Sequence, residues 1–173
     1  HEQAHACGGS GYALEAARRA VLSTGRPAIA AACDDVRLNI ADLSDWPQAG
    51  IFSAGASAAV LVPAEKGMGL HKANLWTDVN LKNLARTNPA NEKFFMEGKA
   101  LAQLAPRIIE AAVEYARRVH GVDVDRLKIC PHQFNGNRLE DIRQTFGLRK
   151  DQLINVVNLY GNTSNPSGMI GLD

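Results

Sequence analysis

The sequence predicts an α/β layered fold in which short apolar strands alternate with helices. Helical periodicity marks two long segments, one at 8–24 and one that ends near residue 120. Apolar runs of strand length occur at 28–33 and within 51–62, and two more lie near 127–130 and 153–159. Because helices that alternate with strands pack in layers against a sheet, this order favours the α/β class.

The composition is that of an ordinary globular protein of 173 residues, with 46% hydrophobic and 21% charged residues. A net charge of +1 and the lack of a lysine or arginine run give no reason to expect a nucleic acid partner. The longest apolar run, 51–62, is too short to cross a membrane, and no secretory signal pattern opens the sequence. The three cysteines are scattered and suit free thiols in the cytoplasm, which is the expected location.

The first helix is predicted at 8–24, where alanines recur at helical spacing. Gly25 and Pro27 should end it, because glycine accepts a left-handed conformation and proline cannot continue a helix. After the strand at 28–33, the polar segment 34–48 is predicted to be a loop. The next strand, within 51–62, should end at Pro63.

Partial alternation of apolar and polar side chains predicts an antiparallel strand at 70–79, followed by a loop at 87–93. The long helix up to His120 should contain Pro106 either as a kink or in its first turn. The side chains expected on its inward face are Leu101, Leu104, Ile108, Ala112, Tyr115 and Val119. A shorter helix is predicted at 135–146, with Leu139, Ile142 and Phe146 facing inward.

Residues with useful chemistry stand where these elements begin or end. Pro131 cannot continue the strand before it, so His132 should emerge at the end of that strand. Asn162 lies in the polar turn that follows the strand at 153–159. Cys7 precedes a helix, whose dipole and unpaired N–H groups favour the thiolate. Cysteine, histidine and asparagine together are components of an acyl-transfer site.

Each of these residues also has a simpler structural interpretation. Cys7 could be a small buried side chain packed against alanine, His132 a capping residue and Asn162 a turn former beside Gly161. His1 and His5 could form a metal cluster with Cys7, but no second ligand group lies nearby, so no metal site is predicted.

The segments Cys7, 52–61, 131–135 and 161–164, in this order, resemble the ketoacyl-acyl carrier protein synthase III family of the thiolase superfamily. The resemblance covers nearly the whole chain and implies a thiolase-like layered fold, a mixed sheet with buried helices, incomplete at both ends. The chain would be an internal portion of such an enzyme. Residues 1–62 would be the remainder of the amino-terminal half with the nucleophile helix, and 63–173 most of the carboxy-terminal half.

The resemblance also implies an acyltransferase of fatty acid or polyketide biosynthesis. Cys7 would carry an acyl group, and a malonyl thioester would condense with it after losing carbon dioxide. His132 and Asn162 would donate hydrogen bonds that stabilise the enolate. Asn135 resembles a position that contacts the pantetheine arm, although it could equally be the N-cap of the helix that follows it.

The family resemblance implies no cofactor, because acyl-CoA and the malonyl thioester are substrates. The implied partners are acyl-CoA or acyl carrier protein, and either a second copy of the chain or a chain that supplies the missing parts of the fold. In many family members Gly-Asp occupies the positions of Ser53 and Ala54, a departure expected to change packing beside the site.

Two alternative functions stay open at the level of sequence. The first is a non-decarboxylative acyltransferase of the same family in specialised metabolism, and the second is a non-catalytic subunit that completes a partner synthase. The joint presence of Cys7, His132 and Asn162 favours decarboxylative condensation.

Overall fold

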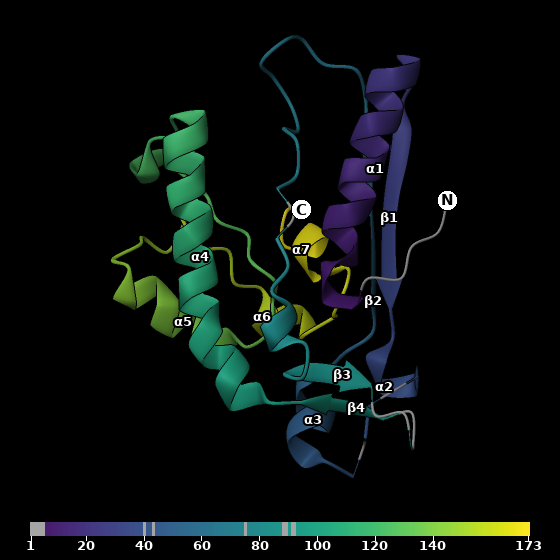
Figure 1. The fold of residues 1–173 in the computed structure, drawn as a ribbon, viewed down its shortest axis with the longest axis vertical. Helices are drawn as coiled ribbons and strands as arrows, with labels where there is room; N and C mark the ends of the chain where they lie inside the picture. The colour runs from purple at the N-terminus through teal and green to yellow at the C-terminus, as the bar shows by residue number, and fades with distance from the viewer. Residues whose placement is uncertain (1–5, 40, 43, 75, 88–89, 91–92) are drawn as a thin grey trace.

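The structure is a computed structural model that describes residues 6–173 except 40, 43, 75, 88–89 and 91–92. On one side of the molecule, α1 (Gly9–Thr24) lies along the antiparallel strands β1 (Ala28–Asp34) and β2 (Gly55–Leu61) (Figure 1). On the other side stand α4 (Gly98–His120) and α5 (Gly136–Thr145) (Figure 1). The short helices α6 (Val157–Tyr160) and α7 (Ser167–Ile170) lie between the two sides (Figure 1).

The remaining elements are short. They are the 3-10 helices η1 (Ala6–Gly8), η2 (Val79–Leu81) and η3 (Val124–Arg126), the helices α2 (Val36–Asn39) and α3 (Trp46–Ile51), and the strands β3 (Ala85–Thr87) and β4 (Phe94–Met96). β3 and β4 pair with each other in antiparallel orientation. Among the described residues, no helix is both long and apolar enough to cross a membrane.

The predicted first helix and the strand after it are confirmed. Gly25 adopts a left-handed conformation with φ of 66° and closes α1 by donating its N–H to the carbonyl of Val21. β1 and β2 then form an antiparallel ladder from Ala28↔Leu61 to Asp34↔Gly55. The small side chains of Ala30 and Ala32 are buried, which is consistent with close packing of α1 on these two strands.

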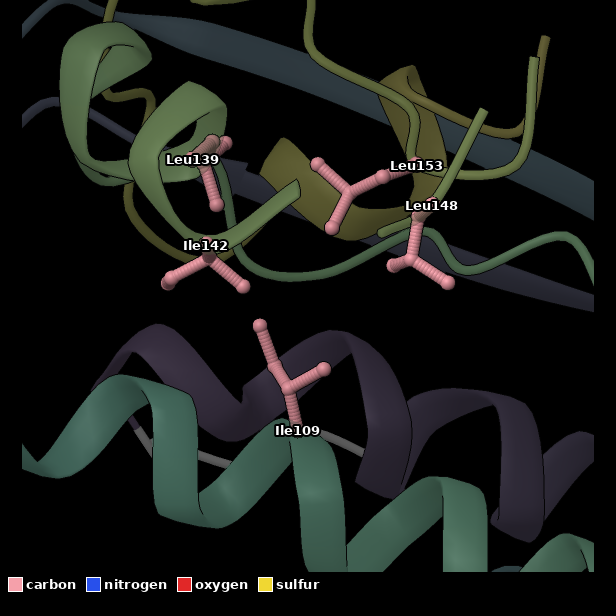
Figure 2. Close-up of a cluster of buried hydrophobic side chains, with 5 residues drawn as sticks. All are labelled: Ile109, Leu139, Ile142, Leu148 and Leu153. Atoms are coloured by element: carbon pink, nitrogen blue, oxygen red, sulfur yellow. The ribbon is translucent and has the colours of Figure 1, made fainter. Parts of the chain in front are cut away.

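A second core joins α4 to α5 and the loop after it. Figure 2 shows Ile109 pointing from α4 toward the other members of this cluster, which are Leu139, Ile142, Leu148 and Leu153. The predicted inward face of α4 is wrong in part, because Ile108 and Val119 are 52% and 48% exposed and Ala112 is exposed as well. The buried stripe instead follows Ala105, Ile109 and Val113, since α5 covers α4 along this narrow i, i+4 row. The helix begins well before Pro106, so this residue is not in its first turn.

Several predicted elements in the chain differ from the structure. No strand forms among the described residues of 70–79. Apolar and polar side chains alternate there only in part, and these residues pair with no neighbouring strand. The segment 34–48, predicted to be a loop, contains α2 and the start of α3. The predicted loop at 87–93 lies only partly within the described residues.

The two strands expected at 127–130 and 153–159 are reduced to one parallel bridge between Ile129 and Leu153. The chain turns into α6 soon after this bridge, where the side chain of Asn155 donates to the carbonyl of Gly136 and accepts from the N–H of Val157. Asparagine side chains that bond to the backbone in this way compete with a strand. A second parallel bridge, between Phe52 and Asn162, anchors the start of the turn that follows α6.

Candidate active site

The turn 162–167 contains Asn162 and contacts both Cys7 and His132. Asn162 begins this turn. Ser164 lies next to Cys7, with 3.4 Å between its Oγ and the cysteine sulfur. Ser167, which begins α7, lies next to His132, with 2.6 Å between its Oγ and the ring Nδ1. One short turn therefore contacts or contains all the residues expected to do the chemistry.

Cys7 lies in η1, immediately before α1. The start of α1 packs closely on the turn, because a Cβ added at Gly9 would lie 2.6 Å from Oδ1 of Asn165. Although Cys7 is exposed as a residue, the protein atoms around its sulfur raise the pKa of the thiol. The hydrogen bond with Ser164 lowers this pKa and the charge of Asp34 raises it further.

The helix start was expected to favour the thiolate of Cys7, but the net effect on the pKa is in the other direction. Removal of the sulfur from water opposes ionisation more than the nearby donors favour it. The thiol is the resting form, and Ser164 is the side chain that favours the thiolate when it forms.

His132 directly follows Pro131, close to the Ile129–Leu153 bridge. Its ring stacks on Phe134, with 6.4 Å between centroids and 24° between planes. Burial lowers the pKa of His132 to about 4, so the imidazole is neutral at physiological pH. Among the described residues, the ring nitrogen Nε2 has no hydrogen-bond partner and is available for a ligand.

The low pKa of His132 predicts a pH dependence of stability. The folded-state value is about 4, below the value of about 6.5 in an unfolded chain. Between these values the unfolded state binds more protons, so the free energy of unfolding should fall by about 3 kcal/mol as the pH drops from about 6.5 to about 4. Urea unfolding of wild type and His132→Gln at several pH values tests this, because the variant should lack this part of the pH dependence. Parallel curves for the two proteins would contradict the assignment.

Asn162 is buried, and its backbone forms the parallel bridge with Phe52, which lies shortly before β2. Its N–H donates to the carbonyl of Ile51 at 3.1 Å, and its carbonyl accepts from the N–H of Ser53 at 2.9 Å. Its side-chain Oδ1 accepts from the N–H of Ser164 at 2.9 Å. Within the part of the chain that the structure describes, the amide nitrogen Nδ2 has no acceptor and remains free to donate.

The backbone of the turn is unusual at Ser164, a non-glycine residue with φ of 57°. Such left-handed conformations cost energy and occur often at functional sites. In this conformation the N–H of Ser164 donates to the side-chain oxygen of Asn162, and its hydroxyl lies within hydrogen-bond distance of the Cys7 sulfur. Ser164 therefore links the cysteine to the asparagine.

Contacts from Ser53 and from Gly55, the first residue of β2, hold the turn 162–167 and the residues just before it in place. The hydroxyl of Ser53 donates to the carbonyl of Tyr160, two residues before Asn162, so this departure from the family pattern lies beside the site. At Gly55 an added Cβ would lie 2.7 Å from the Cβ of Thr163. Glycine is therefore required at this position for Thr163 to pack against the strand.

Gly55→Ala should displace the turn and destabilise the protein by about 1–3 kcal/mol, the usual cost of overpacking. Thermal unfolding measures the effect. Gly50→Ala is the matched control, because an added Cβ at Gly50 meets nothing within 4 Å. Equal stability of the two variants would show that Thr163 can move aside without cost.

Asn135 is the N-cap of α5, with its side-chain oxygen accepting from the N–H of Arg138 at 3.1 Å. The capping interpretation of this residue is confirmed. Contact with a pantetheine arm stays a prediction.

Gln133 is the residue whose role the sequence did not reveal. It is 1% exposed, and all its side-chain polar atoms are paired. Its Nε2 donates to the carbonyls of Pro131 and Ile154, and its Oε1 accepts from the N–H of Val156. Gln133 therefore fastens the segment that carries His132 to the segment that leads to Asn162. Its neighbours His132 and Asn135 are polar as well, so no local signal in the sequence distinguishes Gln133.

The described residues contain no group of three or more His, Cys, Asp or Glu side chains that could hold a metal ion. His1 and His5, the other members of the cluster considered with Cys7, lie outside the described residues.

No protein-family model matches the chain. It is 30% identical over 164 residues to the beta-ketoacyl-acyl carrier protein synthase III of Staphylococcus saprophyticus, covering 94% of this chain and 52% of that protein. The corresponding synthase of Staphylococcus aureus strain N315 is 28% identical over 173 residues, which is 99% of this chain and 55% of that protein. The chain thus spans about half the length of the curated relatives it matches.

Solved structures give the same result for the fold. The synthase III of Thermus thermophilus matches with a TM-score of 0.85 at 25% identity, covering 97% of this chain and 56% of that one. The priming beta-ketosynthase of the R1128 polyketide pathway matches with a TM-score of 0.86 at 25% identity, covering 99% of this chain and 55% of that one. The predicted thiolase-like fold class is confirmed.

Proposed function

We propose that this chain, which resembles an internal portion of a beta-ketoacyl-acyl carrier protein synthase III in sequence and in fold, carries the acyl-transfer site of a decarboxylating condensing enzyme. The observation that supports this most is the turn 162–167. It contains Asn162, lies against Cys7 through Ser164 and lies against His132 through Ser167. A nucleophile and two neutral donors are the groups that such a reaction needs.

In the first step, the sulfur of Cys7 attacks the carbonyl of an acyl-CoA. A new thioester forms on Cys7 while the bond to the CoA sulfur breaks, and the proton of the Cys7 thiol ends on the departing CoA. Because one thioester replaces another, this exchange is close to balanced in free energy. The hydrogen bond with Ser164 lowers the pKa of Cys7 and thereby supports the attacking thiolate.

In the second step, a malonyl thioester loses carbon dioxide and leaves an enolate. The Nε2–H of a neutral His132 and the Nδ2–H of Asn162 donate hydrogen bonds to the enolate oxygen. The enolate carbon then attacks the acyl group on Cys7, and the thiolate of Cys7 leaves as the β-ketoacyl thioester forms. The low pKa of His132 favours this role, because a neutral ring donates without adding a charge to be desolvated.

The rest of the proposal concerns assembly and substrates. Residues 1–62 would belong to the amino-terminal half of a thiolase-like enzyme and 63–173 to its carboxy-terminal half. Acyl-CoA or acyl carrier protein would deliver the substrates, with Asn135 near the pantetheine arm. A second copy of the chain, or a chain with the complementary part of the fold, would complete the enzyme. The reaction would serve fatty acid or polyketide biosynthesis.

Intact-protein mass spectrometry after incubation with acetyl-CoA tests the first step. The chain should gain the mass of one acetyl group, and Cys7→Ala should gain none. Addition of malonyl-acyl carrier protein labelled in its free carboxylate should then release labelled carbon dioxide. Acylation of Cys7 without this release would favour the non-decarboxylative acyltransferase. If no acetyl group is added to Cys7, the function as a non-catalytic subunit would be the remaining alternative.

A further inference from the structure

Ser167 is an almost fully buried hydroxyl at the start of α7, with 1% of its surface exposed. Its Oγ lies 2.6 Å from Nδ1 of His132. The backbone N–H of Gln133 donates to the same oxygen at 3.3 Å. The hydroxyl is therefore held between the catalytic candidate His132 and the residue that follows it.

These contacts fix the direction of the hydrogen bond between serine and histidine. The Oγ already accepts from Gln133, and its own proton needs an acceptor because water does not reach a residue this buried. Within the described part of the chain, Nδ1 of His132 is the only acceptor within reach of that proton. If Nδ1 carried a hydrogen and donated it, the serine proton would be buried without a partner, which is unfavourable.

We propose that Ser167 is a positioning residue that holds the neutral His132 ring in the tautomer with hydrogen on Nε2. The hydroxyl donates to Nδ1, so Nδ1 bears no hydrogen and the single ring hydrogen lies on Nε2. The bond also fixes the rotation of the ring, together with the stacked Phe134. This inference rests on the proposed function, in which Nε2–H is the donor to the enolate.

The same geometry separates Ser167 from the other serine of the turn. Ser164 contacts the sulfur of Cys7 and should affect acylation. Among the described residues, the side chain of Ser167 bonds only to the histidine segment, while its backbone N–H donates to the carbonyl of Ser164 at 3.3 Å, so loss of the hydroxyl should affect decarboxylation alone. Alanine variants of Ser164 and Ser167 therefore serve as controls for each other, the first for acylation and the second for decarboxylation.

Nitrogen NMR of the chain labelled with 15N-histidine tests the proposal without requiring activity. The signals of His132 are assigned by their loss in His132→Gln. At neutral pH, Nδ1 should have the shift of an unprotonated, hydrogen-bonded nitrogen and Nε2 that of a protonated one. In Ser167→Ala the Nδ1 signal should lose the shift caused by the hydrogen bond, and in Ser167→Thr it should keep it. A protonated Nδ1 in the wild-type chain would overturn the proposal.

Kinetics supply the second measurement. Ser167→Ala should release carbon dioxide roughly tenfold more slowly, as expected for the loss of one hydrogen bond, while acetylation of Cys7 keeps its rate. Ser167→Thr should restore most of the release. Equal loss of both steps in Ser167→Ala would contradict a role through His132. A wild-type chain with the expected tautomer but no release of carbon dioxide would refute the proposed function and leave the tautomer assignment intact.

Discussion

Replacement of Asn162 by aspartate should slow the release of carbon dioxide from a malonyl thioester by about 10²–10³-fold, the usual cost of losing one oxyanion donor. Aspartate keeps an oxygen that can accept from the N–H of Ser164, so the turn should keep its shape. It lacks the NH₂ group, and its charge repels the enolate. The measurement is the rate of labelled carbon dioxide release, with the rate of Cys7 acetylation determined in parallel.

The matched control for this experiment is Asn158→Asp. This residue lies in α6, is exposed and makes no hydrogen bond through its side chain within the described part of the chain. It should release carbon dioxide at nearly the wild-type rate. If Asn162→Asp also kept the wild-type rate, Asn162 would be a turn former only.

Replacement of Gln133 by alanine should lower the free energy of unfolding by about 3 kcal/mol or more. The change leaves the N–H of Val156 and the carbonyls of Pro131 and Ile154 without their partner. Each buried polar group left unpaired costs about 1–3 kcal/mol, and the cavity adds to this cost. Urea unfolding followed by circular dichroism measures the difference from wild type.

Gln103→Ala is the matched control for Gln133→Ala, because Gln103 is exposed on α4 and the change should alter stability by less than about 0.5 kcal/mol. Gln133→Glu adds a sharper test, since the shape is kept and the donating NH₂ is lost. It should also be strongly destabilised at neutral pH, where a buried carboxylate would face two carbonyl oxygens. Normal stability of both Gln133 variants would show that the segments at 131–133 and 154–156 are fastened by other contacts.

Local signals were sufficient for the parts of the fold that depend on local energetics. The end of α1 follows from Gly25 and Pro27, whose conformations are restricted wherever they occur. β1 and β2 follow from apolar runs bounded by turn residues. The buried face of α4 could not be read from its periodicity alone, because the position of α5 decides whether Ile108 or Ile109 is covered.

The same limit applies to the candidate site. Cys7, His132 and Asn162 are predicted as site residues because their residue types and surroundings match a known order of motifs. Ser164 and Ser167 were missed as partners, since a serine in a polar turn has the same sequence pattern whether it is exposed or buried. Their roles depend on Cys7 and His132, which reach them from segments 157 and 35 residues away in the chain.

The contact between Cys7 and Ser164 can form only late in the synthesis of the chain on the ribosome. These residues are separated by 157 positions, so Cys7 cannot contact Ser164 until the turn at 162–167 has left the ribosome. The closing of such a long loop costs conformational entropy, which contacts elsewhere in the fold must offset. During synthesis the thiol of Cys7 therefore lacks the Ser164 hydroxyl, and under the proposed function a nascent chain should load an acyl group more slowly than the complete chain.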